Sequence, residues 1–191
     1  GREVQGLTQV SKVLVDVCEQ ISEAAKSGSA IPGLETGLID VDNFIMGLNK
    51  SDLILIASRP GMGKTSIALN IALHVAKTSG KAIAVFSLEM SKEQLATRLL
   101  AGESFINNKK LQTGVLSADE WRKLAAAAAS ISKCDIRIDD NPSLTVADMN
   151  AQCRRVKNLG LVVIDYLQLM QSAGGQSRGS DNRTQVVADI S

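Results

Sequence analysis

The segment SRPGMGKT, residues 58–65, joins an aliphatic run, LILIA at 53–57, to an apolar helical pattern at 67–76. A glycine-containing turn between a strand and a helix that ends in Lys-Thr is typical of a phosphate-binding loop. Ser58 stands where the usual pattern has its first glycine, and a small residue still fits there. The alternative is a turn that precedes Lys-Thr by chance, which the strand-loop-helix context disfavours.

Each residue type in this loop suits a phosphate. Gly61 and Gly63 let backbone amides approach an anion closely, and the helix that follows presents its positive end. Lys64 adds a charge for the β- and γ-phosphates of ATP, while the Thr65 hydroxyl can coordinate Mg²⁺. We therefore expect the nucleotide to be bound by Ser58, Arg59, Pro60, Gly61, Met62, Gly63, Lys64, Thr65 and Ser66.

Two carboxylates follow apolar strands. Asp165 ends LVVID, residues 161–165, at the position where ligands of parallel sheets gather, and we expect it to hold Mg²⁺ through water. Glu89 closes the run 82–88, the expected neighbour of the loop strand, and could deprotonate an attacking water. The alternative for Glu89 is a surface acid ahead of the helix that Ser91 begins.

The rest of the pattern predicts an α/β fold. Aliphatic runs at 53–57, 82–88, 136–138 and 161–164 suit a mostly parallel sheet that is buried on both faces. Between them, Ser91, Ser117 and Thr145 each stand three residues before an acid or amide, the pattern that begins a helix.

Composition excludes several classes of protein. With 191 residues, 45% of them hydrophobic and a net charge of +1, the chain is neither wholly disordered nor a basic nucleic-acid tail. Three cysteines and one histidine argue against a disulfide framework and a zinc centre. The absence of a long apolar run or a secretory leader predicts a soluble, cytoplasmic chain without a membrane partner.

Residues 7–26 carry apolar side chains at intervals of three and four, which predicts an amphipathic helix. A Gly- and Pro-containing connector follows, so we divide the chain into a helix with connector, 1–32, and a main domain, 33–191. The apolar stripe either folds back on its own domain or docks on a neighbouring subunit.

The motifs SRPGMGKT, FSLEM at 86–90 and DYLQLM at 165–170 resemble those of the hexameric replicative DNA helicases of the DnaB type. The resemblance implies a RecA-like P-loop NTPase core behind a linker helix. It also implies ATP hydrolysis coupled to translocation on single-stranded DNA and to unwinding at the replication fork. Glu89 would be the catalytic base, Lys64 a catalytic lysine and Asp165 the Walker B acid. A homo-hexameric ring, primase and a helicase loader would be the partners within the primosome.

The resemblance also implies limits. The family's glutamine sensor, further DNA loops and arginine finger lie downstream of residue 191, so the domain is expected to be incomplete and these residues alone nearly inactive. Arg178 and Arg183, in the Gly- and Ser-rich stretch 172–183, could meet DNA phosphates, or could be solvated and touch nothing. The aromatic residues are expected in the core, which favours backbone tracking over base stacking.

Three other functions stay open at this point. The chain could belong to a recombinase or clock-type RecA relative, or to a ring-assembly module that binds ATP without hydrolysing it. A small-molecule kinase is the third and would need an acceptor pocket.

Overall fold

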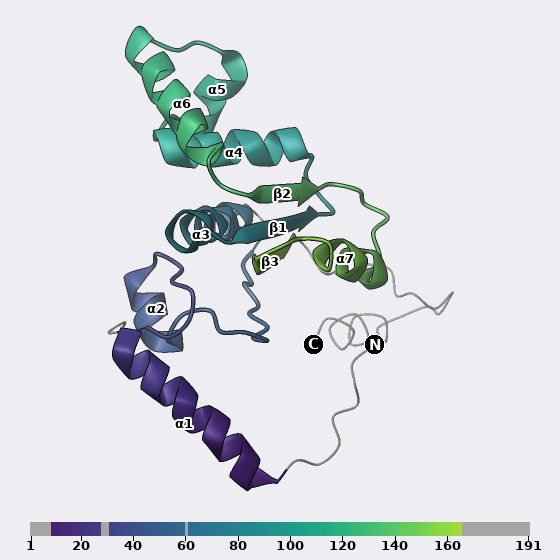
Figure 1. The fold of residues 1–191 in the computed structure, drawn as a ribbon. Coiled ribbons are helices and arrows are strands. Elements are labelled where there is room, and N and C mark those ends of the chain that lie inside the picture. Colours follow the sequence, from purple (N-terminus) through teal and green to yellow (C-terminus); the bar gives the residue numbers. More distant parts are fainter. Residues whose placement is uncertain (1–8, 28–30, 60, 166–191) are drawn as a thin grey trace.

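The structure, a computed structural model, describes residues 9–27, 31–59 and 61–165. Its centre is a parallel sheet of three strands in the order β2-β1-β3, with helices on both faces (Figure 1). The α/β class and the mostly parallel sheet predicted from the sequence are therefore confirmed. The strands are β1 (Ala82–Ser87), β2 (Ile136–Asp139) and β3 (Leu159–Asp165). The helices are α1 (Val10–Ser27), α2 (Ile39–Ile45), α3 (Lys64–Ser79), α4 (Lys92–Ser104), α5 (Asn108–Thr113), α6 (Ala118–Ile131) and α7 (Val146–Cys153).

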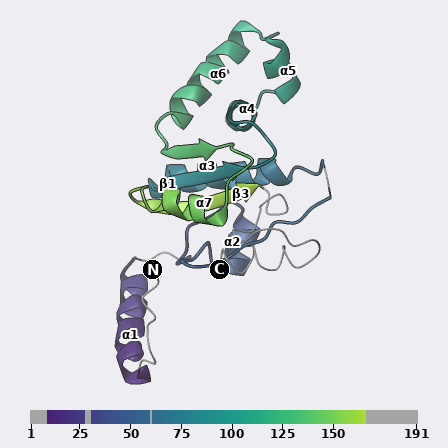
Figure 2. The same cartoon turned by 90° about the vertical axis from the view of Figure 1, so that its right-hand side faces the viewer.

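Strand β1 is the centre of the core, because all six of its residues are buried. Successive side chains of a strand point to opposite faces. Ile83 and Val85 accordingly join one apolar cluster with α3 and α4, while Ala84 and Phe86 join a second cluster with α7. Figure 2 shows the same layering from the side, with α4 and α7 on opposite sides of the strands. A strand with both faces covered explains the uninterrupted apolar run in the sequence.

The three predicted helix starts are all confirmed as capping boxes. Ser91, Ser117 and Thr145 each accept a hydrogen bond from the amide three residues later, and the side chain of that later residue bonds back to the cap amide. Each box satisfies two backbone donors that the first helical turn leaves free. The starts of α4, α6 and α7 are thus encoded locally.

The prediction of a strand at 53–57 is wrong. This segment is not paired with any strand in the described part of the chain, and the side chains of Leu53 to Ile56 are 40–63% exposed. An apolar run shows that a segment gains from burial, but a strand also needs a neighbour for its backbone hydrogen bonds. Strand β1 lies between β2 and β3, so the expected neighbour relation between Glu89's strand and a loop strand is wrong as well.

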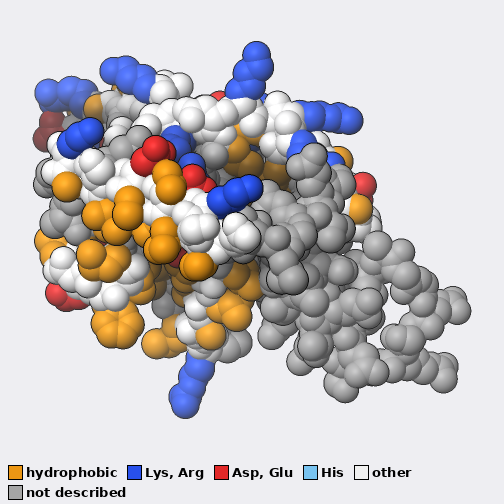
Figure 3. Space-filling model, turned by 60° about the horizontal axis from the view of Figure 1, so that its bottom comes forward, with side chains coloured by type: hydrophobic (Ala, Val, Ile, Leu, Met, Phe, Trp, Pro, Cys, Tyr) orange, Lys and Arg blue, Asp and Glu red, His pale blue; other side chains and the backbone are white. Residues whose placement is uncertain are grey.

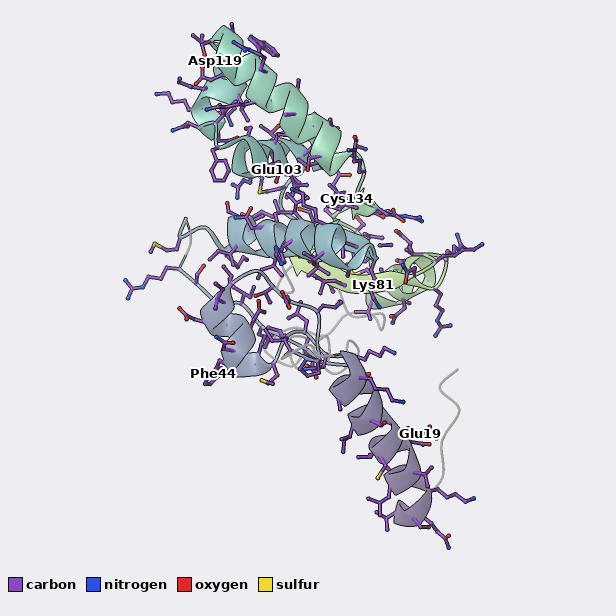
Figure 4. The ribbon with its side chains drawn as sticks, turned by 60° about the vertical axis from the view of Figure 1, so that its left-hand side comes forward. Glu19, Phe44, Lys81, Glu103, Asp119 and Cys134 are labelled. Carbon is purple, nitrogen blue, oxygen red and sulfur yellow. The ribbon has the colours of Figure 1, made fainter. Side chains whose placement is uncertain are left out.

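The expectation that the aromatic residues lie in the core holds only for Phe86 among those described. Phe44 and Phe105 are 90% and 95% exposed, and Trp121 is 55% exposed. Figure 4 shows Phe44 on the side of α2 away from the sheet. Phe105 caps the end of α4 in a left-handed conformation, where the chain turns outward. Neighbouring apolar residues in the sequence therefore did not indicate burial at these positions.

Helix α1 stands apart from the sheet (Figures 1 and 2). All of its described side chains are exposed, including Val10, Leu14 and Ile21 of the predicted stripe. Figure 3, a view from the side of α1 and α2, shows hydrophobic side chains gathered on this face. The structure thus does not show the fold-back alternative. Within the described ranges, every helix is too short or too polar to span a bilayer.

Candidate functional site

The loop before α3 has the backbone conformation that its glycines permit. Gly61 and Gly63 have φ angles of +77° and +86°, which side-chain-bearing residues rarely adopt. No atom lies within 4 Å of where a Cβ would stand on either residue, so both backbones border open space. The amide of Met62 donates to the carbonyl of Arg59 at 3.3 Å and closes a turn. The loop therefore leaves open space beside its two glycines, just before the first turn of α3.

Three polar side chains meet where this loop enters α3. The hydroxyl Oγ1 of Thr65 donates to Oδ2 of Asp165 at 2.6 Å, and Nζ of Lys64 lies 3.1 Å from Oδ1 of the same carboxylate. Thr65 and Asp165 are buried, at 9% and 5% exposure. The first turn of α3 and the carboxyl end of β3 thus bring together residues that are 100 positions apart in the sequence.

Glu89 lies at the same edge of the sheet, where the backbone pairing of β1 with β3 places it. The register of β1 on β3 pairs Ser87 with Asp165, and the Leu88 amide then donates to the Asp165 carbonyl at 2.8 Å. Glu89 follows directly, and it is exposed while Leu88 is buried. Because the carboxyl ends of parallel strands meet at one edge, both acids lie on the side where α3 begins.

The remaining predicted residues are distributed around this centre. Ser58, Arg59, Gly61, Met62 and Ser66 are exposed on the loop and the first turn of α3. The structure brings Lys64 and Thr65 into direct contact with Asp165, and the other described loop residues lie on the surface around this contact. Three predicted residues lie outside the described residues: Pro60, Arg178 and Arg183.

A third acid lies at this edge after β2. The carboxylate of Asp140 accepts a hydrogen bond from the Lys92 amide at 3.0 Å, which lowers the pKa of Asp140 below its ordinary value. The bond joins the end of β2 to the start of α4. The Asp140 carboxylate therefore caps the start of α4, which is a structural role that Glu89 does not share.

The arrangement fits a bound nucleoside triphosphate with its magnesium ion. The loop offers open backbone, a lysine and a helix start, which together bind phosphate oxygens. The hydroxyl of Thr65 and the carboxylate of Asp165 are hard oxygen donors, and Mg²⁺ in such sites takes one or two protein oxygens in addition to phosphate. Among the described residues, no group of three His, Cys, Asp or Glu side chains forms an alternative metal site.

Sequence reasoning missed Ser87, which is completely buried at the end of β1. The signal was present, because Ser87 is the one polar residue in the run AIAVFSL at 82–88. Buried hydroxyls are normally hydrogen-bonded, so a serine inside an apolar strand indicates a specific partner.

Comparison with known proteins agrees with this geometry. A family model described as the DnaB-like helicase C-terminal domain matches residues 33–191. The chain is 44% identical over 185 residues to the replicative DNA helicase DnaB of Geobacillus stearothermophilus, covering 95% of this chain and 40% of that protein. It is 41% identical over 193 residues to the replicative DNA helicase DnaC of Bacillus subtilis, covering 100% of this chain and 42% of that protein. The chain thus spans about two fifths of the length of these relatives.

Solved structures lead to the same family. A solved ATPase domain superposes with a TM-score of 0.82 at 29% identity, covering 97% of this chain and 65% of that one. A DnaB-like replicative helicase, solved in a study of its interactions with primase, also gives 0.82 at 29% identity, covering 96% of this chain and 45% of that one. The RecA-like fold expected from the sequence is therefore confirmed, and the chain belongs to the family of DnaB-like helicase C-terminal domains.

Proposed function

We propose that this chain forms the nucleotide-binding part of an ATP-dependent replicative DNA helicase. The observation that carries the proposal is the contact of Lys64 and Thr65 with Asp165 beside an open glycine loop, in a chain of the DnaB-like family. Residues 33–191 would be the ATPase domain, and 1–32 a linker helix with its connector. Hydrolysis would drive movement along single-stranded DNA and separation of the duplex.

Each residue of the site has a role that its position supports. Lys64 would neutralise the β- and γ-phosphates, and Thr65 with Asp165 would hold Mg²⁺. Mg²⁺ bound there would neutralise charge that develops on the phosphate oxygens. Glu89, the exposed acid that follows Leu88 at the same edge of the sheet as Asp165, would orient the attacking water and accept its proton.

The partners follow from the relatives. We propose a homo-hexameric ring in which α1 docks on the adjacent protomer, because its apolar stripe is exposed on its own subunit. One structural neighbour is titled as a DnaB-like helicase with its interactions with primase, which supports primase as a partner. A helicase loader, DNA contacts through Arg178 and Arg183, and a cytoplasmic location complete the proposal.

The test measures phosphate release and unwinding of a forked duplex by the full-length protein that carries this sequence. We expect single-stranded DNA to stimulate phosphate release, and ATP to be required for unwinding. Lys64→Ala should abolish nucleotide binding or turnover. Glu89→Gln should bind ATP with unchanged affinity but lose at least about a hundredfold in kcat, the range expected for a lost general base.

Glu93→Gln is the matched control, because it removes an exposed acid four residues away on the first turn of α4. It should keep kcat within about twofold. Hydrolysis that survives Glu89→Gln, or that falls equally in both variants, would contradict the role of Glu89. Phosphate release that ignores DNA would indicate a ring-assembly module. DNA-dependent release without unwinding would indicate a recombinase-type relative.

A further inference from the structure

The turn between β1 and α4 carries Glu89 and is held by a buried hydroxyl. Ser87 begins this turn and is 0% exposed. Its hydroxyl donates to the Met90 carbonyl at 2.7 Å and accepts from the Met90 amide at 3.0 Å. One side chain therefore ties both polar groups of the residue that follows Glu89.

The turn is also fixed on its other sides. The Leu88 amide donates to the Asp165 carbonyl at 2.8 Å, and the Leu88 side chain is buried. After Met90, the capping box of Ser91 fixes the start of α4. Glu89 is the one exposed residue in the segment 82–90, and the backbone on both sides of it is hydrogen-bonded.

Among the side chains that fix this turn, the Ser87 hydroxyl makes both bonds to Met90, the residue directly after Glu89. The bond from the Leu88 amide to the Asp165 carbonyl is made by backbone atoms and does not depend on the side chain, proline excepted. The two bonds to the Met90 backbone depend on the Ser87 hydroxyl. Without that hydroxyl, two backbone groups lose their partner and the turn gains freedom to rearrange. A displacement of about 1 Å at a reacting group can cost about a hundredfold in rate.

We propose that Ser87 is a positioning residue for hydrolysis: by tying Met90 it holds the Glu89 carboxylate at a fixed place relative to Asp165. The inference rests on the proposed function, since it requires Glu89 to act on the attacking water. Ser87 itself touches no substrate and acts through Glu89.

The test compares Ser87→Ala with Ser104→Ala in the full-length protein. Ser104 is a matched control: it is 4% exposed, and its hydroxyl likewise donates to a carbonyl, that of Leu100, and accepts from an amide, that of Ile106. It lies at the far end of α4, about 18 Å along the helix axis from Lys92, where the helix begins. Both variants remove one buried hydroxyl, so thermal stability should fall to a similar extent in both.

We expect Ser87→Ala to lower kcat about tenfold to a hundredfold with unchanged nucleotide affinity and KM. Ser104→Ala should keep kcat within about twofold. Hydrogen exchange supplies a readout besides activity, because the Met90 amide should exchange faster in Ser87→Ala and unchanged in Ser104→Ala. An unchanged kcat in Ser87→Ala, or a joint loss of nucleotide affinity, would overturn the positioning role. So would unchanged exchange at Met90.

Glu89→Gln separates this inference from the proposed function. If Glu89→Gln loses hydrolysis but Ser87→Ala keeps it, only the positioning role fails. If Glu89→Gln keeps hydrolysis, the assignment of Glu89 itself fails. In the Glu89→Gln background, Ser87→Ala should lower the residual rate less than twofold, because no base remains to be positioned. If Ser87→Ala lowered the residual rate of Glu89→Gln by the same factor by which it lowers the rate of the unaltered protein, the inference would be overturned.

Discussion

At the scale of single residues, the site depends on glycines with unusual backbone angles and on an acid that regular strand pairing holds in place. Gly61 and Gly63 hold positive φ angles beside open space, so their conformation, and not crowding, requires glycine. Asp165 is placed in the opposite way, by the regular pairing of β3 on β1. The site combines a loop whose backbone requires glycine with an acid that any extended strand could present.

Helix α3 offers a matched pair of glycines that tests the loop. Gly63 precedes its first turn with φ 86° and ψ 16°, and Gly80 follows its last turn with φ 63° and ψ 16°. Alanine at either position costs about 1–2 kcal/mol of strain. We expect similar losses of stability in Gly63→Ala and Gly80→Ala, measured by denaturant unfolding. Only Gly63→Ala should also weaken nucleotide binding, because its methyl group would take up open space in the loop where we propose that the phosphates bind.

Equal nucleotide affinity in the two variants, measured by calorimetry, would contradict phosphate binding at this loop. A loss in Gly80→Ala as large as that in Gly63→Ala would show instead that any strain at the ends of α3 disturbs the site.

At the scale of elements, sequence reasoning succeeded where the signal is local. The caps at Ser91, Ser117 and Thr145 were predictable, because each hydroxyl meets an amide three residues away. The segment 53–57 was not, since pairing requires a partner that its own residues do not encode. Helix α2 begins at Ile39, and its N-cap residue, Leu38, has no side chain that could bond a first-turn amide, so the capping pattern that marks the other helix starts is missing here. Helix α5 was missed although Asn107 and Gly114 mark its two ends.

The candidate site likewise has a part that local sequence motifs indicate and a part that they do not. The residue types and spacing of the loop, with Asp165 after an aliphatic strand, predicted which side chains meet. The contact of Ser87 with Met90 depends on the path of a turn, and no motif reports it.

The cap of α6 predicts a pH dependence. Hydrogen bonds from the Lys110 side chain and the Ser117 amide lower the pKa of Glu120 from 4.5 to about 2. A depressed pKa stabilises the folded state above pH 4.5, and this stabilisation is lost as the pH falls toward 2. The protection of the first-turn amides of α6, measured as their exchange rate relative to the intrinsic rate at each pH, should therefore fall across this range. In Glu120→Gln, whose amide oxygen can still accept but does not titrate, this loss of protection should be absent. An unchanged profile in that variant would contradict the assignment.

At the scale of the whole molecule, buried and exposed apolar surfaces are separated. The core gathers around β1, whereas α1, α2 and the segment 53–56 expose large aliphatic or aromatic side chains (Figure 3). Exposed apolar patches of this kind mark surfaces that other chains or segments cover. The proposed ring accounts for the stripe on α1.

Self-association of the chain tests that account. Leu14, a residue of the stripe, is 53% exposed, so Leu14→Asp would bury a charge in any interface formed there. We expect the mass in solution to rise with concentration, and Leu14→Asp to weaken this association at least tenfold. Ser22→Asp places the same charge on the same helix, about 80° around it from Leu14 and outside the apolar stripe, and should change the association less than about twofold. A strict monomer, or equal effects of the two variants, would contradict docking through α1.

The pairing of β1 with β3 has a consequence for divergence within the family. The bond between the Leu88 amide and the Asp165 carbonyl is made by main-chain atoms, which every amino acid except proline can supply at the donor position. The spacing between the two strand ends can therefore persist while most side chains around it are exchanged. Relatives with fewer than half of their residues in common with this chain can inherit the same layout, provided that no residue is inserted or deleted within either strand.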